Sequence, residues 1–146
     1  MRGFYVLLIF VPRQERIRVG SLGVLEFSPG RYAYVGKAIG ISLERRLSRH
    51  FKRNKTLRRH IDYLTSRFKP IEARYTEEAR SEEEIVEEMT AIGRKPVFKG
   101  FGSSDSKAYS HLLYSEFKRG LPKKYKRKKF EPVRSICYDS RIREAL

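Results

Sequence analysis

The order of apolar and polar residues along the chain predicts strands and helices in mixed succession. Phe4–Phe10 is apolar or aromatic at every position, which is typical of a central strand buried on both faces. Two β-prone runs on either side of Gly20–Gly23 predict a hairpin, and Tyr32–Val35 predicts the next strand. Because there is no regular βαβ alternation, we expect an α+β fold with a small central, mainly antiparallel sheet flanked by helices.

Three stretches have the apolar spacing of amphipathic helices. Ser42 is placed to cap the first, which we expect to reach about Arg53, and the second is expected over Thr56–Arg67 with its leucines facing inward. The third follows Ser81, and Glu84 is placed to complete a capping box with it. Short strands are also expected at Ile71–Tyr75 and His111–Tyr114.

Charge changes this picture by suggesting a partner. The chain of 146 residues has 33 Lys and Arg against 17 Asp and Glu, a net charge of +16, which indicates a polyanionic partner. The cations are concentrated in Lys37–His60 and Lys118–Lys129, whereas Glu72–Glu88 is acidic. Two basic blocks on a short chain favour nucleic acid, although a charge run is also typical of a solvated face.

The length fits one domain, with a change of composition near its end. We expect residues 1–117 to form the domain and residues 118–146 a basic extension, either a solvated segment or one that packs back on the domain. Phe4–Val11 is the longest apolar run and is too short to cross a bilayer, and we expect no signal peptide before it. The single Cys137 excludes an intramolecular disulfide, so we expect a cytoplasmic protein with no membrane partner, and a monomer is favoured.

Two tyrosines on predicted strands, with an arginine and a histidine on the next predicted helix, can together handle a phosphodiester. Tyr5 ends a Gly-Phe-Tyr run and Tyr34 opens a Tyr-Val-Gly run. Arg46 and His50 are four residues apart, so they share a helix face. A single strand tyrosine is more often a residue at the edge of the core, so the interpretation depends on the combination.

This order of motifs resembles the GIY-YIG nuclease family. Its hallmark is a Gly-Ile-Tyr-like strand, a Tyr-Ile-Gly-like strand and a helix with an arginine followed four residues later by a histidine. The chain has Gly3-Phe4-Tyr5, Tyr34-Val35-Gly36 and Arg46-Leu47-Ser48-Arg49-His50 in that order. Over about residues 3–114 it is similar to a poorly characterised, largely prokaryotic branch of the family. The resemblance implies a GIY-YIG-like fold and a metal-dependent endonuclease that acts on DNA.

The resemblance also implies a role for each motif residue. Tyr34 is expected to be the general base, and Tyr5 to position the attacking water. Arg46 is expected to hold the scissile phosphate, and His50 to relay a proton or to hydrogen-bond that phosphate. Other expected contacts with the nucleic acid are Gly36, Lys37, Arg49, Lys123, Lys124, Lys126 and Arg127. A supporting pair behind the site is expected from His60 and Asp62.

A divalent ion, Mg²⁺ or Mn²⁺, is implied by the same resemblance, which places its ligand on a glutamate of the third helix. Glu84 is expected to bond back to the Ser81 cap, and Glu83 and Glu87 to face away from the apolar stripe. Glu82 falls on that stripe, where an unpaired carboxylate is unfavourable and a cation would relieve it. Glu82 is therefore the expected metal ligand, and the alternative is a glutamate stabilised by the helix dipole.

The same basic fold could also bind nucleic acid without cutting it. A non-catalytic DNA- or RNA-binding module needs the cations but needs neither a pair of tyrosines nor an inward glutamate. His111 lies in an apolar run and is expected to be a core histidine instead of a ligand. The proposed site residues therefore separate the nuclease from the binding module.

Overall fold

The computed structural model describes residues 3–38, 42–77, 79–103, 106–116 and 126–127. Its strands are β1 (Gly3–Val11), β2 (Glu15–Arg18), β3 (Val24–Phe27), β4 (Gly30–Ala38), β5 (Glu72–Thr76), β6 (Lys95–Pro96), β7 (Leu112–Ser115) and β8 (Lys126–Arg127). Six of them form one sheet in the order β6-β7-β4-β1-β5-β8, and every neighbouring pair is antiparallel. The fold is α+β with an antiparallel sheet, which confirms the predicted class.

The two long central strands, β1 and β4, carry the tyrosine motifs. In their antiparallel register Tyr5 lies opposite Gly36, and Leu7 lies opposite Tyr34. Cross-strand partners project to the same face of a sheet, and positions two residues apart on one strand also share a face. The two tyrosine rings are therefore diagonal neighbours on one face, which sequence order alone does not reveal.

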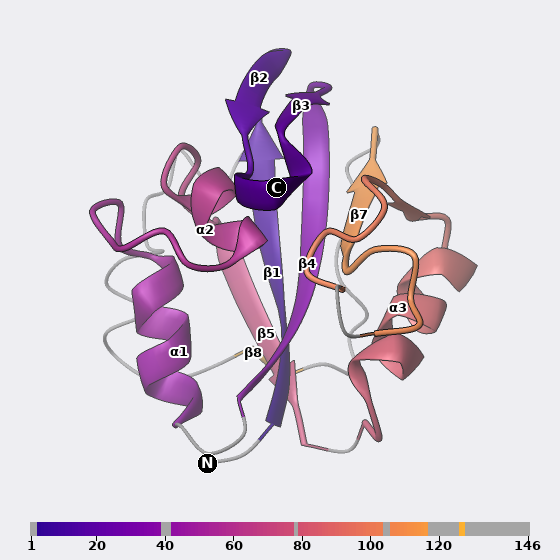
Figure 1. The fold of residues 1–146 in the computed structure, drawn as a ribbon. Helices are drawn as coiled ribbons and strands as arrows, with labels where there is room; N and C mark the ends of the chain where they lie inside the picture. Colours follow the sequence, from indigo (N-terminus) through magenta and orange to yellow (C-terminus); the bar gives the residue numbers. More distant parts are fainter. Residues whose placement is uncertain (1–2, 39–41, 78, 104–105, 117–125, 128–146) are drawn as a thin grey trace.

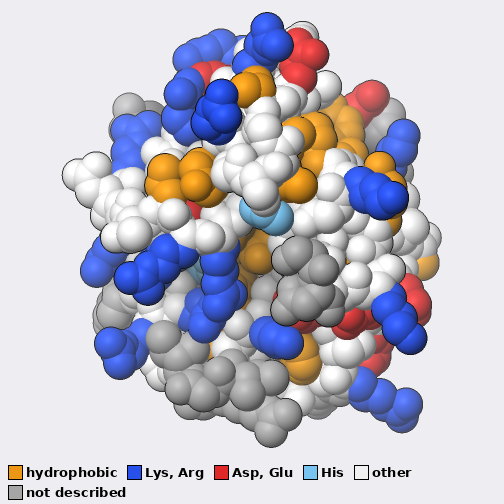
Figure 2. Space-filling view, viewed as in Figure 1, with side chains coloured by type: hydrophobic (Ala, Val, Ile, Leu, Met, Phe, Trp, Pro, Cys, Tyr) orange, Lys and Arg blue, Asp and Glu red, His pale blue; other side chains and the backbone are white. Residues whose placement is uncertain are grey.

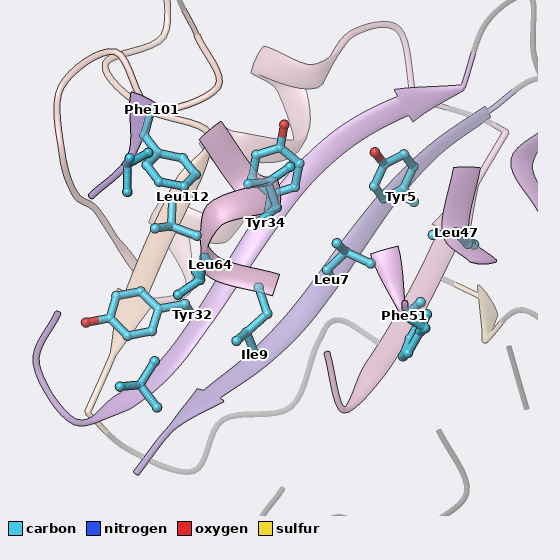
Figure 3. Packing of buried hydrophobic residues seen from close by; sticks show 14 of the residues in the cluster. Tyr5, Leu7, Ile9, Tyr32, Tyr34, Leu47, Phe51, Leu64, Phe101 and Leu112 are labelled. Carbon is cyan, nitrogen blue, oxygen red and sulfur yellow. The ribbon is translucent and has the colours of Figure 1, made fainter. Parts of the chain in front are cut away.

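Helices cover both faces of the sheet. The helices α1 (Leu43–His50) and α2 (His60–Thr65) lie on one side, and α3 (Glu82–Ala91) lies on the other (Figure 1). Figure 3 shows the first apolar cluster, in which residues of β1 and β4 meet Leu47 and Phe51 of the α1 region. A second cluster on the α3 side contains Ile85 and Met89. The sheet is thus buried on both faces, as the apolar run of β1 predicts.

The predicted hairpin is confirmed and forms a separate small sheet. Strands β2 and β3 pair with each other, and a short 3-10 turn, η1 (Gly20–Leu22), connects them. Gly23 closes this turn with a φ of 80°, a left-handed conformation that favours glycine. In Figure 1 the hairpin stands above the end of the central strands, next to α2.

The predicted lengths of the first two helices were wrong, and local hydrogen bonds explain why. Helix α1 ends at His50 instead of Arg53, because Lys55 Nζ donates to the His50 carbonyl (3.1 Å) and satisfies part of the helix end. Helix α2 begins at His60 instead of Thr56. The extended chain before it leaves Leu57 43% exposed, whereas the helical pattern placed this leucine inward.

Only one strand of the predicted basic extension lies in the described part of the chain. The backbone of β8 pairs with Arg74 and Tyr75 of β5, so Lys126 and Arg127 form a sheet edge. Lys123 and Lys124 lie outside the described residues. The boundary at residue 117 and the phosphate contacts of these four cations stay predictions. In the described part of the chain, no helix has the length and apolar character needed to cross a membrane.

A bidentate ion pair joins α1 to α2. Arg49 donates from Nη1 to Asp62 Oδ1 (2.7 Å) and from Nη2 to Asp62 Oδ2 (3.0 Å). Asp62 Oδ2 also accepts the backbone N–H groups of Arg58 (3.0 Å) and Arg59 (2.9 Å), which caps α2 and fixes its first residue. Burial raises the pKa of Asp62, but hydrogen bonds from Arg49 and from the two backbone groups outweigh it and lower the pKa to about 2.

Replacing Asp62 with alanine is expected to lower the free energy of unfolding by about 3 kcal/mol, because it leaves Arg49 and two backbone donors without their acceptor. The stabilisation by Asp62 is complete above its ordinary pKa of 3.8 and is lost as the pH falls towards about 2. Urea unfolding of the wild type and of Asp62→Ala, from about pH 2 to above pH 3.8, measures the loss of stability and its dependence on pH. The exposed Glu87→Ala variant is the control, with a change within about 0.5 kcal/mol. An Asp62 variant as stable as Glu87→Ala would contradict this role.

Candidate active site

A cleft of about 550 Å³ opens at the edge of β4. The described ladder between β4 and β7 stops at Tyr34, and one further hydrogen bond runs from Val35 N to the His111 carbonyl (3.0 Å). Since β4 continues to Ala38, the cleft takes residues from both faces of the sheet. It is lined by Phe4, Tyr34, Lys37, Arg58, Arg59, His60, Arg80, Ser81, Glu82, Glu83, Gly102, Ser106 and His111.

The surface around this region is divided by charge. Figure 2 shows a hollow in the middle of the face, with Lys and Arg side chains gathered on the side of α1 and α2, whereas the α3 side has acidic as well as basic side chains. The cations that line the cleft are Lys37, Arg58, Arg59 and Arg80. Arg58 and Arg59 stood in the sequence only as members of a basic block, and Arg80 lies in the acidic segment, so no motif identified them as site residues.

The structure brings Tyr5, Tyr34 and His50 together in one buried group, and the fourth predicted catalytic residue, Arg46, hydrogen-bonds to Tyr5. The Tyr5 hydroxyl lies 2.8 Å from Nε2 of His50, and both side chains are buried. The ring of His50 lies 5.4 Å from that of Tyr5 and 6.4 Å from that of Tyr34, measured between centroids. Figure 3 shows both tyrosine hydroxyls directed to the same side of the sheet. The helix-borne histidine is thus fixed by the first tyrosine motif.

Two glycines make room for the two phenols. A Cβ atom on Gly36 would lie 2.5 Å from the Tyr5 hydroxyl oxygen, and one on Gly102 would lie 2.9 Å from Cε1 of Tyr34. Gly102 also has a φ of 67°, a conformation that favours glycine. Gly36 was predicted to contact substrate, and the structure gives it a packing role against Tyr5. Gly102 was not predicted, because its contact depends on a loop brought to β4 by the fold.

Burial dominates the proton chemistry of the two phenols. Burial raises the pKa of Tyr5 above its ordinary value, although the charges of Arg46 and Arg59 partly oppose this effect. Burial also raises the pKa of Tyr34, and the negative charge of Glu82 adds to it. Both phenols are therefore protonated at neutral pH. Either one becomes a base only when more positive charge enters the cleft.

Arg46 and His50 contribute different kinds of group. Nε of Arg46 is buried and, among the described residues, has no hydrogen-bond partner. Burial, followed by the positive charge of Lys55, lowers the pKa of His50 to about 3. His50 is thus neutral near pH 7 and shares a proton with the Tyr5 hydroxyl in a hydrogen bond without adding positive charge. Any positive charge for a phosphate therefore comes from neighbouring cations and not from His50.

The predicted supporting pair, His60 and Asp62, has two separate roles. Asp62 holds Arg49, as described above, whereas Nδ1 of His60 accepts the backbone N–H of Gly102 (2.9 Å). Arg49 was predicted to contact the nucleic acid, but both of its terminal nitrogens donate to Asp62. In the structure Arg49 therefore supports α2. His60 lines the cleft and fixes the glycine against which Tyr34 lies.

The predicted metal ligand lies in the cleft. The side chain of Glu82 is 16% exposed, and its Oε1 lies 3.7 Å from Lys37 Nζ. Its Oε2 lies 3.4 Å from His111 Nδ1, so His111 is buried as predicted but also reaches the cleft. Among the described residues, no three His, Cys, Asp or Glu side chains come together as a metal-binding group. Any ion held here by Glu82 therefore takes most of its ligands from water and substrate.

The other glutamates at the start of α3 differ partly from the prediction. Glu83 was expected to face away from the core side, but it lines the cleft and accepts a hydrogen bond from Ser106 Oγ (2.6 Å). Ser81 caps α3 by accepting the N–H of Glu84 (3.2 Å), as predicted. The carboxylate of Glu84 accepts the N–H of Arg80 (2.9 Å), one residue before the expected partner. Glu84 is thus a capping residue.

These features define an α+β domain with a mainly basic cleft, which is lined by one buried tyrosine, Tyr34, and by the carboxylates of Glu82 and Glu83. One family model, described as a domain of unknown function, DUF123, matches residues 4–132, and the chain belongs to this family. The match continues past residue 117, where the sequence placed a domain boundary. Searches of curated proteins and of solved structures found no match. The GIY-YIG likeness stays a prediction.

The ring of His50 is expected to stay neutral between about pH 5 and pH 8, because its pKa of about 3 in the folded protein lies below the ordinary value of 6.5. Because the ordinary pKa is 6.5 and the folded ring takes up a proton only near pH 3, His50 is expected to lower the stability of the fold progressively as the pH falls from about 6.5 to about 3. Histidine-labelled NMR over this pH range measures the titration, and His50→Gln assigns the signal. A midpoint near 6.5 for His50 would show that the ring is not buried against Tyr5.

Proposed function

We propose that this protein is a metal-dependent nuclease that hydrolyses phosphodiester bonds, with DNA as its substrate. The observation that carries the proposal is the Tyr5–His50 hydrogen bond beside Tyr34, next to a cleft with four cations and Glu82 in its lining. A purely structural tyrosine–histidine pair would not need a neighbouring cleft with these charges. A DNA substrate also fits the cytoplasmic location and the monomeric state, which stay predictions.

The cations give the phosphate two kinds of contact. Lys37, Arg58 and Arg59 line the cleft and provide general attraction for a polyanion. Arg46 on α1 is not among the residues that line the cleft; its side chain hydrogen-bonds to Tyr5, and its buried Nε has no partner among the described residues. A planar guanidinium is well suited to hold two phosphate oxygens at once. We therefore assign the scissile phosphate to Arg46 and the flanking phosphates to the cations of the cleft.

The residues at Glu82 fit one divalent ion. Mg²⁺ and Mn²⁺ accept sites with one or two carboxylates, completed by water and phosphate oxygens. Lys37 neutralises Glu82 at 3.7 Å and is 55% exposed on its side chain, so it can turn towards a phosphate and leave the carboxylate to a cation. When bound, such an ion supplies positive charge at the phosphate and an activated water.

The phenols and His50 would then handle the proton. Tyr34 lines the cleft. We assign its hydroxyl to hold the attacking water and to receive the proton of that water once added positive charge lowers the raised pKa of the phenol. The Tyr5 hydroxyl is held 2.8 Å from Nε2 of His50, so its orientation is fixed before substrate arrives. Such preorganisation avoids reorientation in the transition state.

A non-catalytic DNA- or RNA-binding module is the second candidate. It is favoured by the raised pKa values of Tyr5 and Tyr34, since phenols that stay protonated suit hydrogen bonding to a phosphate as well as catalysis. This candidate uses the same cations and requires no ion at Glu82. The two candidates therefore differ in whether an added divalent ion changes the nucleic acid covalently.

One assay separates the candidates. Labelled duplex, flap, junction and single-stranded DNA, together with RNA, are incubated with the full chain in Mg²⁺, in Mn²⁺ and with a chelator. Cleavage that the chelator stops supports the nuclease and names its substrate. Binding without cleavage on every substrate supports the binding module, and absence of both overturns the two candidates.

Arg46→Ala is expected to lower cleavage by about 10²–10³-fold, the usual loss when one preorganised donor to the transition state is removed. The protein should remain folded, because Arg46 is partly buried beside the apolar stripe of α1 and is not part of it. Single-turnover cleavage and circular dichroism measure the two quantities. Arg45→Ala, an exposed neighbour on the same helix, is the matched control and should cleave normally. Normal cleavage by folded Arg46→Ala would remove Arg46 from the site.

Glu82→Gln is expected to abolish cleavage, since Glu82 is the carboxylate assigned to the ion. Glu84→Ala should instead lower the free energy of unfolding by about 1 kcal/mol and keep cleavage, because Glu84 caps α3 through the Arg80 N–H. Cleavage assays and urea unfolding on both variants give the comparison. If Glu84→Ala loses activity and Glu82→Gln retains it, the wrong carboxylate has been chosen.

A further inference from the structure

His111 occupies a position in the cleft that its apolar sequence context does not explain. It immediately precedes β7, and only 1% of its surface is exposed. One ring nitrogen, Nε2, lies 3.2 Å from Ser106 Oγ, and the other, Nδ1, lies 3.4 Å from Oε2 of Glu82. Nδ1 is buried and has no hydrogen-bond partner among the described residues. A buried nitrogen thus faces the carboxylate assigned to the ion.

The surroundings of Ser106 fix the tautomer of this histidine. The hydroxyl of Ser106 has one proton, which it donates to Glu83 Oε1 (2.6 Å). That hydrogen bond is also the largest cause of the lowered pKa of Glu83, so the acceptor is an ionised carboxylate. Ser106 Oγ therefore accepts the N–H of Ala108 (3.1 Å) and a second N–H, that of His111 Nε2. Neutral His111 then has a lone pair on Nδ1.

A lone pair on Nδ1 and a carboxylate oxygen at 3.4 Å repel each other unless a cation lies between them. The distance suits a shared metal ion. Two ligands at about 2.0–2.2 Å from one ion, at tetrahedral or octahedral angles, lie roughly 3.0–3.5 Å apart. Lys37 faces the other carboxylate oxygen, Oε1, which leaves Oε2 for the ion.

We propose that His111 and Glu82 together bind the ion, and that the ion is a first-row transition metal such as Mn²⁺, Co²⁺ or Zn²⁺ in preference to Mg²⁺. Imidazole nitrogen favours these ions, whereas Mg²⁺ favours sites made only of oxygen. Ser106 is a positioning residue, because it holds the other ring nitrogen and keeps Nδ1 directed at Glu82. The inference deepens the proposed function and rests on it only for the catalytic use of the ion.

Ion binding is measured by calorimetry on the full chain without nucleic acid, with Co²⁺, Mn²⁺ and Mg²⁺ as separate probes. Wild-type protein is expected to bind Co²⁺ at least about tenfold more tightly than Mg²⁺. Glu82→Gln should lose both ions, whereas His111→Gln should lose the preference and keep Mg²⁺ binding. Glu87→Gln replaces an exposed carboxylate on the same helix as Glu82 and is the matched control, with its preference unchanged.

Two further measurements keep the test decisive if His111→Gln does not fold. Ser106→Ala should weaken Co²⁺ binding by about 10–100-fold and leave Mg²⁺ binding unchanged. In wild-type protein, substoichiometric Mn²⁺ should broaden the NMR signals of His111 before those of His50 and His60. Equal affinity for Co²⁺ and Mg²⁺, or unaffected His111 signals, would overturn the proposal and indicate a proton between His111 and Glu82.

The outcome is independent of the nuclease assay. Tight Co²⁺ binding through His111 without cleavage of any nucleic acid would retain this ion site and reject the proposed function. Cleavage with no preference for Co²⁺ over Mg²⁺ would retain the nuclease and reject His111 as a ligand.

Discussion

The register between β1 and β4 is the constraint on which the site depends. It places Tyr5 opposite Gly36 and Leu7 opposite Tyr34, so both phenols project from one face and only a glycine lies where the Tyr5 ring needs room. A shift of one residue would turn one tyrosine to the α3 side of the sheet. Each face of the sheet packs against its own helices, so such a shift would move the side chains of one apolar cluster into the space that the other cluster fills. Packing of the core therefore sets the geometry of the candidate active site.

Burial then determines which groups in the site are charged. Tyr5, Tyr34 and His50 share a buried region, and each is held in its neutral form. The charged groups are separate from this buried region: they are the Lys and Arg side chains that line the cleft, together with Glu82. This separation suits a site that handles an anion, since neutral hydrogen-bonding groups inside need no counterion before the substrate arrives. In the proposed mechanism, the proton chemistry of the phenols would therefore depend on what enters the cleft.

The sequence predicts the features that depend on local patterns, and it does not predict those that depend on contacts between distant segments. Periodicity predicts the strand around Phe4–Phe10 and the inward side of Glu82. Capping preferences predict the helix starts after Ser42 and Ser81. The start of α2 does not, because it depends on how the buried Asp62 is shared between Arg49 and two backbone groups. Glu83 was misplaced for a related reason: its partner, Ser106, comes from a loop 23 residues later in the chain. A local pattern contains no information about such a partner.

In the proposed site, competition at Glu82 would link the binding of an ion to the binding of nucleic acid. In the structure Oε1 of Glu82 faces Lys37, and Oε2 faces His111. A phosphate that draws Lys37 away leaves the carboxylate without its counter-charge, which makes Glu82 a better ligand for a cation. By linkage, the cation must strengthen phosphate binding by the same factor, since it frees Lys37 and adds positive charge. The proposed ion and substrate would therefore each strengthen the binding of the other. The pKa of both phenols would stay raised until both are bound, so neither phenol would lose its proton before then.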